Sequence, residues 1–103
     1  MKDRVYISGG ITNVPNYHEN FLRAEWELKK MGYTENQIIN PAYICSFLPT
    51  DFSHDEYMAV CFGLMRTCNT IYMLKNWNES KGATREVEIA INNGFTIIEQ
   101  GVD

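Results

Sequence analysis

One stretch of the sequence, residues 76–90, combines residue types and a spacing that could bind an anion next to a carboxylate. Ser80 and Gly82 fall where an apolar run, residues 70–74, has given way to polar residues and a segment with helical periodicity begins. The free N–H groups and the dipole at a helix start attract anions, and open parallel sheets bind ligands where their strands end. We therefore expect an anion-friendly loop here, with Glu86 close by.

Glu86 stands out because of its place on that helix. At about 100° per residue, Ala83, Val87 and Ala90 share one side of the helix, and Glu86 lands on the flank of this apolar side. A carboxylate in that position is directed toward the strand ends rather than toward water, which would suit a functional group. The alternative is a first-turn glutamate that complements the helix dipole.

Other candidate ligand contacts follow the first two expected strands. Gly9 and Gly10 come directly after the first β-rich run and would let the backbone approach a ligand closely, although they could equally form a plain turn. Asn40 ends the second run in an Asn-Pro pair, and we take it as a further candidate for ligand binding.

The elements that must position these residues alternate along the chain. Short β-rich runs at residues 4–8, 37–41, 70–74 and 95–99 predict strands, with helical segments between them. This order implies a parallel sheet with right-handed crossovers. We expect one α/β domain over residues 1–103, a three-layer Rossmann-like or flavodoxin-like sheet of four or five strands with helices on both faces. So small a sheet leaves an apolar helix face hard to cover, which predicts a homodimer or a higher homo-oligomer.

The expected helices carry start signals and apolar stripes. In the first, Phe21 belongs to a stripe that Leu22 and Trp26 widen, so the Trp and Phe are expected in the core. The helix after the second strand opens with a capping box, Ser53 and Glu56. Its buried stripe consists of Tyr57, Cys61, Leu64, Met65 and Cys68, in which the thiols are expected to be inert packing. Residues 42–53 predict a long aromatic loop that covers a site, with a piece of core or a dimer contact as alternatives.

Composition excludes several classes of function. The chain of 103 residues carries a formal net charge of −4 and no basic cluster beyond Lys29–Lys30. We therefore expect no duplex nucleic acid as a partner, because phosphate binding needs a concentrated positive field. The absence of an apolar run near ~18 residues and of a charged-then-apolar leader predicts no membrane span and no signal peptide. Three cysteines and two histidines without metal-ligand spacing predict no metal site and a reduced, cytoplasmic protein.

Two segments together resemble the nucleoside 2-deoxyribosyltransferase family. They are Val5-Tyr6-Ile7-Ser8-Gly9 near the start and Ser80-x-Gly82-x-x-x-Glu86-x-x-x-Ala90 near the end. The likeness is closest to a small branch found in bacteria and phages, and it extends to the related 2′-deoxynucleoside 5′-monophosphate N-glycosidases. It covers nearly the whole chain. It implies a nucleotide or nucleoside as the small-molecule ligand, with no metal or organic cofactor.

The resemblance also implies roles for single residues. Glu86 matches the family nucleophile, which attacks the anomeric carbon to form a glycosyl-enzyme intermediate. Tyr6 matches the first-strand tyrosine that contacts the sugar or the nucleophile, and Gly9 and Gly10 match the turn after it. Ser80 matches the serine that monophosphate-specific relatives place on the 5′-phosphate, where transferases acting on free nucleosides tend to have Asp. Ser80 could alternatively be only a helix cap.

One position departs from the family pattern. Relatives carry an Asp on the middle helix that helps to protonate the leaving base, and Cys61 occupies that position here. Asp51 or Asp55 could substitute for it. The alternative is a catalytically impaired protein, of the kind that a phage would encode, which holds or senses a nucleotide without turning it over. Trp77 could stack on the base or pack at a dimer interface.

Overall fold

The computed structural model, which describes residues 3–101, is built on a four-stranded sheet. All strands are parallel, in the order β2-β1-β3-β4. Their bounds are β1 Val5–Ser8, β2 Ile38–Ile39, β3 Thr70–Met73 and β4 Thr96–Glu99. From β1 the chain continues to β2 at one edge of the sheet, and it then crosses back to β3 on the other side of β1. The strand order therefore reverses between β1 and β3, which is where doubly wound sheets bind ligands at the carboxyl ends of their strands.

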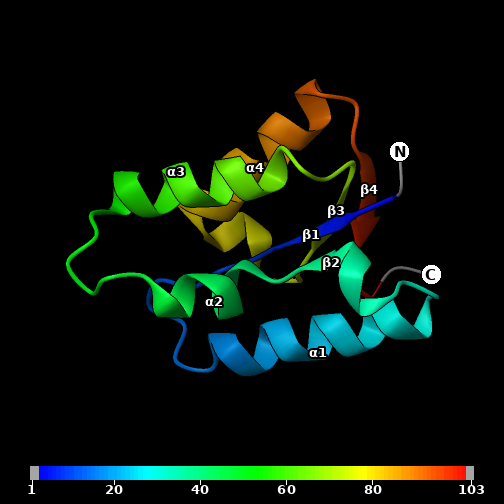
Figure 1. The fold of residues 1–103 in the computed structure, drawn as a ribbon, viewed down its shortest axis with the longest axis horizontal. Coiled ribbons are helices and arrows are strands. Elements are labelled where there is room, and N and C mark those ends of the chain that lie inside the picture. The colour runs from blue at the N-terminus through cyan, green and yellow to red at the C-terminus, as the bar shows by residue number, and fades with distance from the viewer. Residues whose placement is uncertain (1–2, 102–103) are drawn as a thin grey trace.

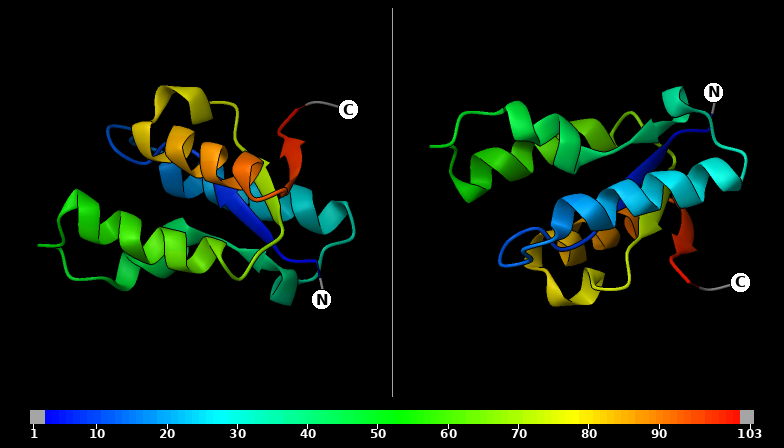
Figure 2. Two further views of the ribbon diagram at one scale, coloured as in Figure 1. Left: turned by 90° about the horizontal axis from the view of Figure 1, so that it is seen from above. Right: turned by 90° about the horizontal axis from the view of Figure 1, so that it is seen from below.

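Helices cover both faces of the sheet, so the expected three-layer α/β fold is confirmed (Figure 1). Helix α1 (Tyr17–Lys30) lies on one face. Helices α3 (His54–Met65) and α4 (Lys81–Asn92) lie side by side on the other, as the two views of Figure 2 show. Within residues 3–101, no helix is long and apolar enough to cross a membrane.

The strand residues alternate between two apolar clusters. On β1, Val5 and Ile7 pack with α1, whereas Tyr6 packs with α3 and α4. The same alternation runs along β3, where Tyr72 faces α1 and Ile71 faces the other two helices. Both strands are buried over their whole length, as expected for the central strands of a parallel sheet covered on both sides. This alternation directs every second side chain of β1 toward α4.

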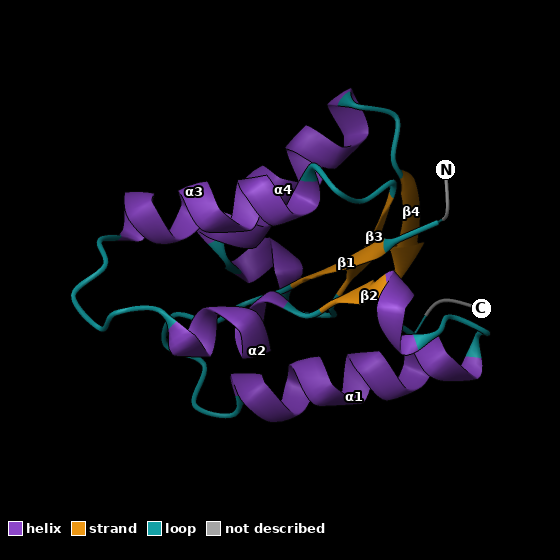
Figure 3. Ribbon diagram, in the orientation of Figure 1, coloured by secondary structure: helices purple, strands orange, loops and turns teal. Residues whose placement is uncertain are grey.

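The sequence predicted one long loop over residues 42–53, and this prediction is wrong for residues 42–47, which are helical. Residues Pro41–Ile44 form a short helix, α2, and Cys45–Phe47 continue as a 3-10 turn, η2. Asn40 caps α2 through its side chain, and proline occupies the first turn, where its fixed φ and missing N–H suit a helix start. The segment from residue 48 to 53 remains a loop that leads to α3 (Figure 3). Two further 3-10 turns are η1 (Glu35–Gln37) and η3 (Trp77–Glu79).

Helix α1 buries a narrower stripe than its sequence suggests. Phe21 is in the core as expected, but Leu22 and Trp26 lie on the open side of the helix, and Trp26 is 59% exposed. The Lys30 ammonium lies 3.9 Å from the centre of the Trp26 ring, a cation–π contact. The expectation that Trp26 belongs to the core is therefore wrong. Only the innermost side chains of α1, those of Phe21, Ala24 and Leu28, reach the core next to the strands.

The start of α3 matches the expectation from sequence. The Ser53 side chain accepts a hydrogen bond from the Glu56 N–H at 3.1 Å, and the Glu56 carboxylate accepts one from the Ser53 N–H at 2.8 Å. This is a complete capping box, and it holds the pKa of Glu56 below its usual range. Cys61 and Cys68 are buried and free, as expected for packing residues.

Candidate active site

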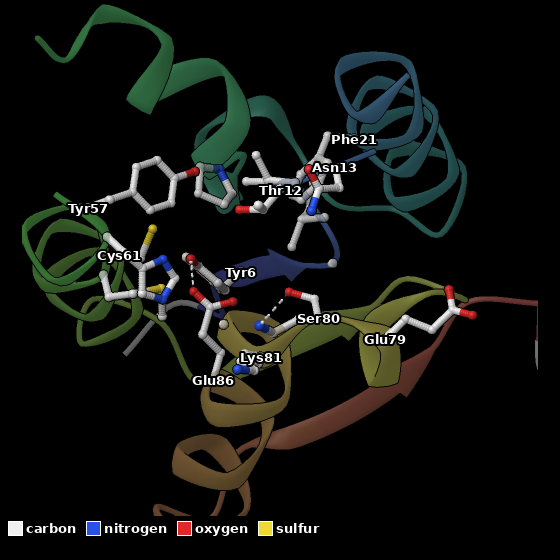
Figure 4. Close-up of a pocket in the computed structure, with 18 residues that line it drawn as sticks. Tyr6, Thr12, Asn13, Phe21, Tyr57, Cys61, Glu79, Ser80, Lys81 and Glu86 are labelled. Atoms are coloured by element: carbon white, nitrogen blue, oxygen red, sulfur yellow. Dashed lines mark hydrogen bonds between the residues drawn. The ribbon is translucent and has the colours of Figure 1, made fainter. Parts of the chain in front are cut away.

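A cavity of about 460 Å³ opens at the carboxyl end of β1 and is walled by the starts of α3 and α4. Its volume lies within the range of small-molecule sites. Most of its lining comes from the β1 end and its loop, from α3, and from η3 and the start of α4, and one residue each of α1 and α2 completes it: Tyr6, Ile7, Gly9, Ile11, Thr12, Asn13; His54, Tyr57, Met58, Cys61; Glu79, Ser80, Lys81, Gly82, Ala83, Glu86; Phe21 and Pro41. The carboxyl group of Glu86 points into the space between these walls (Figure 4).

Glu86 is buried and held by two hydroxyl groups of β1. The Tyr6 hydroxyl donates to Glu86 Oε2 at 2.5 Å, and the Ser8 hydroxyl donates to Glu86 Oε1 at 2.7 Å. Tyr6 and Ser8 are two residues apart on the strand and so share the face that packs on α4. Only 5% of Glu86 is exposed, because it lies on the same helical stripe as the buried Ala83, Val87 and Ala90. The side expected for this residue from helical periodicity is confirmed.

Burial raises the pKa of Glu86 to about 7, although the hydrogen bonds from Tyr6 and Ser8 act in the opposite direction. Withdrawal from water penalises the ionised carboxylate, and the two hydroxyl donors stabilise it. The same surroundings raise the pKa of Tyr6 well above its ordinary value, through burial first and the Glu86 charge second. Tyr6 therefore stays a hydrogen-bond donor, while Glu86 exchanges its proton near neutral pH.

The start of α4 forms the wall next to Glu86. The Ser80 side chain caps the helix by accepting a hydrogen bond from the Ala83 N–H at 3.2 Å. A hydroxyl that accepts in this way keeps its own proton free to donate to a ligand. An α-carbon substituent on Gly82 would meet the Met58 sulfur at 3.1 Å, so the glycine lets α3 and α4 approach closely. Ser80, Lys81 and Gly82 all line the cavity.

The two glycines after β1, Gly9 and Gly10, have different structural roles. A Cβ on Gly9 would stand 2.4 Å from the Leu74 Cδ1 atom and 2.8 Å from its Cβ, so only glycine fits where the chain leaves β1 and passes the Leu74 side chain, directly after β3. Gly9 also lines the cavity. The Gly10 N–H donates to the Asn76 Oδ1 atom at 3.1 Å, which ties this turn to the loop after β3. Gly10 is not among the described residues that line the cavity.

Asn40 and Trp77 also lie outside the set of described residues that line the cavity. The Asn40 side chain accepts from the Tyr43 N–H at 3.2 Å and donates to Glu25 Oε1 at 3.1 Å, so its polar atoms are used within the fold. Trp77 is half-buried against the apolar cluster of the α3–α4 face. Both residues thus have structural surroundings that account for their types, and their assignment to ligand binding has no geometric support here.

The α3 wall carries Cys61 and Tyr57, which face the cavity opposite the start of α4 (Figure 4). Burial, and next the nearby Glu86 charge, raise the pKa of Cys61 to about 12. Burial likewise raises the pKa of Tyr57 well above its ordinary value. Neither group gives up a proton easily near neutral pH. Asp51 and Asp55 are exposed, and neither is among the described residues that line the cavity.

Reasoning from sequence missed several residues of the site, among them Ser8, His54 and Lys81. Ser8 follows Tyr6 at the two-residue spacing of one strand face, a signal that could have identified it as a second donor to Glu86. His54 lines the cavity from the first turn of α3. Its place depends on how α3 packs beside α4, and the sequence holds no signal for that. Within residues 3–101, no group of three or more His, Cys, Asp or Glu side chains is arranged to hold a metal ion.

Comparison with known proteins gives one relationship. No curated protein and no solved structure shows a significant match to the chain. Residues 3–99 match the model of a family described as "Domain of unknown function (DUF4406)", a span that includes both β1 with its hydroxyl donors and α4 with Glu86. The chain therefore belongs to the DUF4406 family.

Proposed function

We propose that this protein cleaves or transfers at the N-glycosidic bond of a 2′-deoxynucleotide, with Glu86 as the nucleophile. The observation that carries the proposal is a buried carboxyl group at the switch point of the sheet, held by two hydroxyl donors and facing a cavity of about 460 Å³. The sequence resemblance to nucleoside 2-deoxyribosyltransferases supports the same assignment, because Tyr6, Ser80 and Glu86 all contribute to that cavity.

Substrate binding follows from the two ends of the cavity. The first turn of α4 offers free N–H groups, the Ser80 hydroxyl and the Lys81 ammonium, a combination that suits a 5′-phosphate. Glu86 lies about one and a half turns further along the same helix. A deoxyribose anchored by its phosphate at the helix start would therefore place its anomeric carbon toward Glu86.

The reaction has two steps. An oxygen of ionised Glu86 attacks the anomeric carbon while the carbon–nitrogen bond breaks, and the bonding electron pair leaves with the base, which takes up a proton. Water then attacks the same carbon of the glycosyl ester, which releases 2-deoxyribose 5-phosphate and restores the carboxylate. A second base in place of water would give transfer. Tyr6 and Ser8 fix the carboxylate at both oxygens, so that it is oriented before the substrate arrives.

Incubation with the four 2′-deoxynucleoside 5′-monophosphates and the matching nucleosides tests the proposal. We expect free base from at least one monophosphate, measured by chromatography, and none from the same samples with Glu86→Gln. Release of base that persists unchanged in Glu86→Gln, or no release from any of the eight compounds, would contradict it.

A second candidate is a protein that binds the nucleotide without turning it over. The high pKa of the Cys61 thiol favours it, because this residue stands where the relatives carry a proton-donating Asp. This alternative predicts a higher melting temperature with a monophosphate, since a ligand of the native state stabilises it. The nucleotide would be recovered intact after long incubation.

The homodimer expected from the sequence stays a prediction. Tyr43 and Phe47 form an edge-to-face pair with ring centres 5.5 Å apart, and Phe47 is 75% exposed. We propose that this pair contributes to the contact, because exposed aromatic side chains are typical of interfaces. Sedimentation of the wild type and of Phe47→Ser tests it, and a monomeric wild type would exclude it.

A further inference from the structure

We propose that His54 supplies the proton that the leaving base requires. The proposal rests on the glycosidic-bond cleavage proposed above and names the residue for a step that the remaining side chains of the cavity serve poorly. His54 begins α3 and lines the cavity that holds Glu86. Histidine is the side chain that enzymes use most often to donate and accept protons.

Elimination among the other proton-bearing groups favours His54, since Lys81 lies at the start of α4, where the proposed function assigns it to the phosphate. Tyr6 is engaged with Glu86, and the thiol of Cys61 and the phenol of Tyr57 hold their protons too tightly near neutral pH. Glu79 is exposed, and its carboxyl group points away from Glu86 (Figure 4). The two aspartates that the sequence offered as substitutes lie outside the described lining of the cavity.

The position of α3 fits this role. A nucleotide with its phosphate at the start of α4 and its anomeric carbon at Glu86 directs its base away from the α4 start. The wall formed by α3 is then available to the base, and His54, Met58 and Cys61 follow one another on it at intervals of three to four residues, which is one face of a helix. His54 is exposed at the outer end of this stripe.

The proton balance closes over the two steps. As the carbon–nitrogen bond breaks, the imidazolium N–H of His54 passes its proton to the base, and the imidazole becomes neutral. In the second step the neutral imidazole takes a proton from the attacking water, so the same residue acts first as acid and then as base. No oxidant or cofactor takes part.

A phosphate contact is the competing role for this residue. His54 also lines a second hollow, of about 810 Å³, between α3 and α4, together with residues of the α4 start. The other charged or titratable side chains around it, in the cavity or this hollow, lie on β1, on α3 and on the η3–α4 segment: Tyr6; Asp55, Tyr57, Cys61; Glu79, Lys81, Arg85, Glu86 and Glu88. The test must therefore separate proton donation from anion binding.

Two substrates with different leaving groups make that separation. The nucleotide monophosphates need a proton on the departing base, whereas 4-nitrophenyl 2-deoxyribofuranoside 5-phosphate releases a phenolate that leaves without one. For His54→Gln we expect kcat on the nucleotide to fall about a hundredfold or more, with KM and nitrophenol release near those of the wild type.

The variant is expected to fold, because Ser53 and Glu56 cap α3 without help from His54, whose side chain is exposed. His18→Gln on α1 is the matched control, since His18 stacks on Tyr17 and is not among the described cavity-lining residues. Equal losses on both substrates, or a raised KM with unchanged kcat, would overturn the proposal in favour of a phosphate contact. If His54→Gln keeps wild-type activity, the role of His54 is overturned and the proposed function stands. If the wild-type protein releases neither free base nor nitrophenol, the proposed function is overturned as well.

Discussion

On each face of the sheet, a strand tyrosine donates a hydrogen bond to a glutamate of the covering helix. Tyr6 of β1 donates to Glu86 of α4 at 2.5 Å, and Tyr72 of β3 donates to Glu27 of α1 at 2.8 Å. Each glutamate also accepts from a second side chain, Ser8 for Glu86 and Gln100 for Glu27. The two pairs therefore have the same chemical composition, with a Tyr, a Glu and one additional donor.

Their surroundings differ. Glu86 is 5% exposed and faces a cavity of about 460 Å³, with both carboxyl oxygens held by hydroxyl groups. Glu27 is half-buried, accepts both bonds through Oε1, and borders a hollow of about 240 Å³ that the cationic Arg23 and Lys75 also line. A Tyr–Glu pair is thus not a site by itself. Burial raises the pKa of Glu86 to about 7, and the open cavity leaves room for a ligand next to its carboxyl group.

The largest expected difference is in activity. Glu86→Gln removes the nucleophile and is expected to abolish base release from the deoxynucleotide, whereas Glu27→Gln, on the opposite face, should leave turnover unchanged. Chromatographic assay of both variants beside the wild type measures this. Comparable losses in the two variants would mean that the glutamates act through the stability of the fold instead.

The second expected difference is in stability. Glu86→Gln is expected to lose activity but to gain stability. The raised pKa of Glu86 means that the native state binds the carboxyl proton more tightly than the unfolded state does. Proton binding therefore stabilises the native state fully below about pH 4.5, and this contribution is lost as pH rises through about 7. Glu86→Gln keeps a neutral side chain at every pH. It should unfold with a free energy up to about 3 kcal/mol higher than the wild type at pH 8, and the gain should shrink toward pH 5.

Denaturant titrations at pH 5 and pH 8 measure this gain, with Glu27→Gln as the control for the loss of a half-buried carboxylate. A Glu86→Gln protein less stable than the wild type at pH 8 would show that the two hydroxyl donors outweigh the cost of burying the charge.

Substitution of the two tyrosines is expected to have smaller effects, which again differ between the two pairs. The Tyr6 hydroxyl stabilises ionised Glu86, so Tyr6→Phe should raise the Glu86 pKa further and move the rise of activity with pH to higher pH. Tyr72→Phe should lower stability by about 1 kcal/mol, the usual net value of one hydrogen bond, and leave the pH profile in place. Initial rates from pH 5 to 9 decide this, and a shifted profile in Tyr72→Phe would remove the contrast between the faces.

The smallest effects are expected from the second donors. Ser8→Ala removes the bond to Glu86 Oε1 and should shift the pH profile in the same direction as Tyr6→Phe, but by less, because the longer of the two bonds is lost. Gln100→Ala removes the bond to Glu27 and should leave activity and its pH dependence unchanged. The same rate measurements apply, and an unshifted Ser8→Ala profile would show that Tyr6 alone holds the carboxylate.

Local signals were sufficient for much of this protein. The alternation of apolar runs predicted the parallel α/β sheet, because strand and helix periodicities are properties of neighbouring residues. The Ser53–Glu56 capping box spans a single turn and was equally readable. Helical periodicity placed Glu86 toward the core side of α4, since a residue's direction on a helix depends only on its position along it. The Asn40–Pro41 helix start was also local but was taken for the end of a strand.

The long-range partnerships were decided by the tertiary structure alone. Tyr6 and Ser8 lie about 80 residues before Glu86 in the chain, and they meet it because β1 runs between β2 and β3 with that face against α4. The exposure of Trp26 reflects how much of α1 a four-stranded sheet can cover, which periodicity does not contain. The sequence thus determined which residues could do chemistry. Packing determined which of them share one cavity, because desolvation and contact depend on neighbours that are distant in the chain.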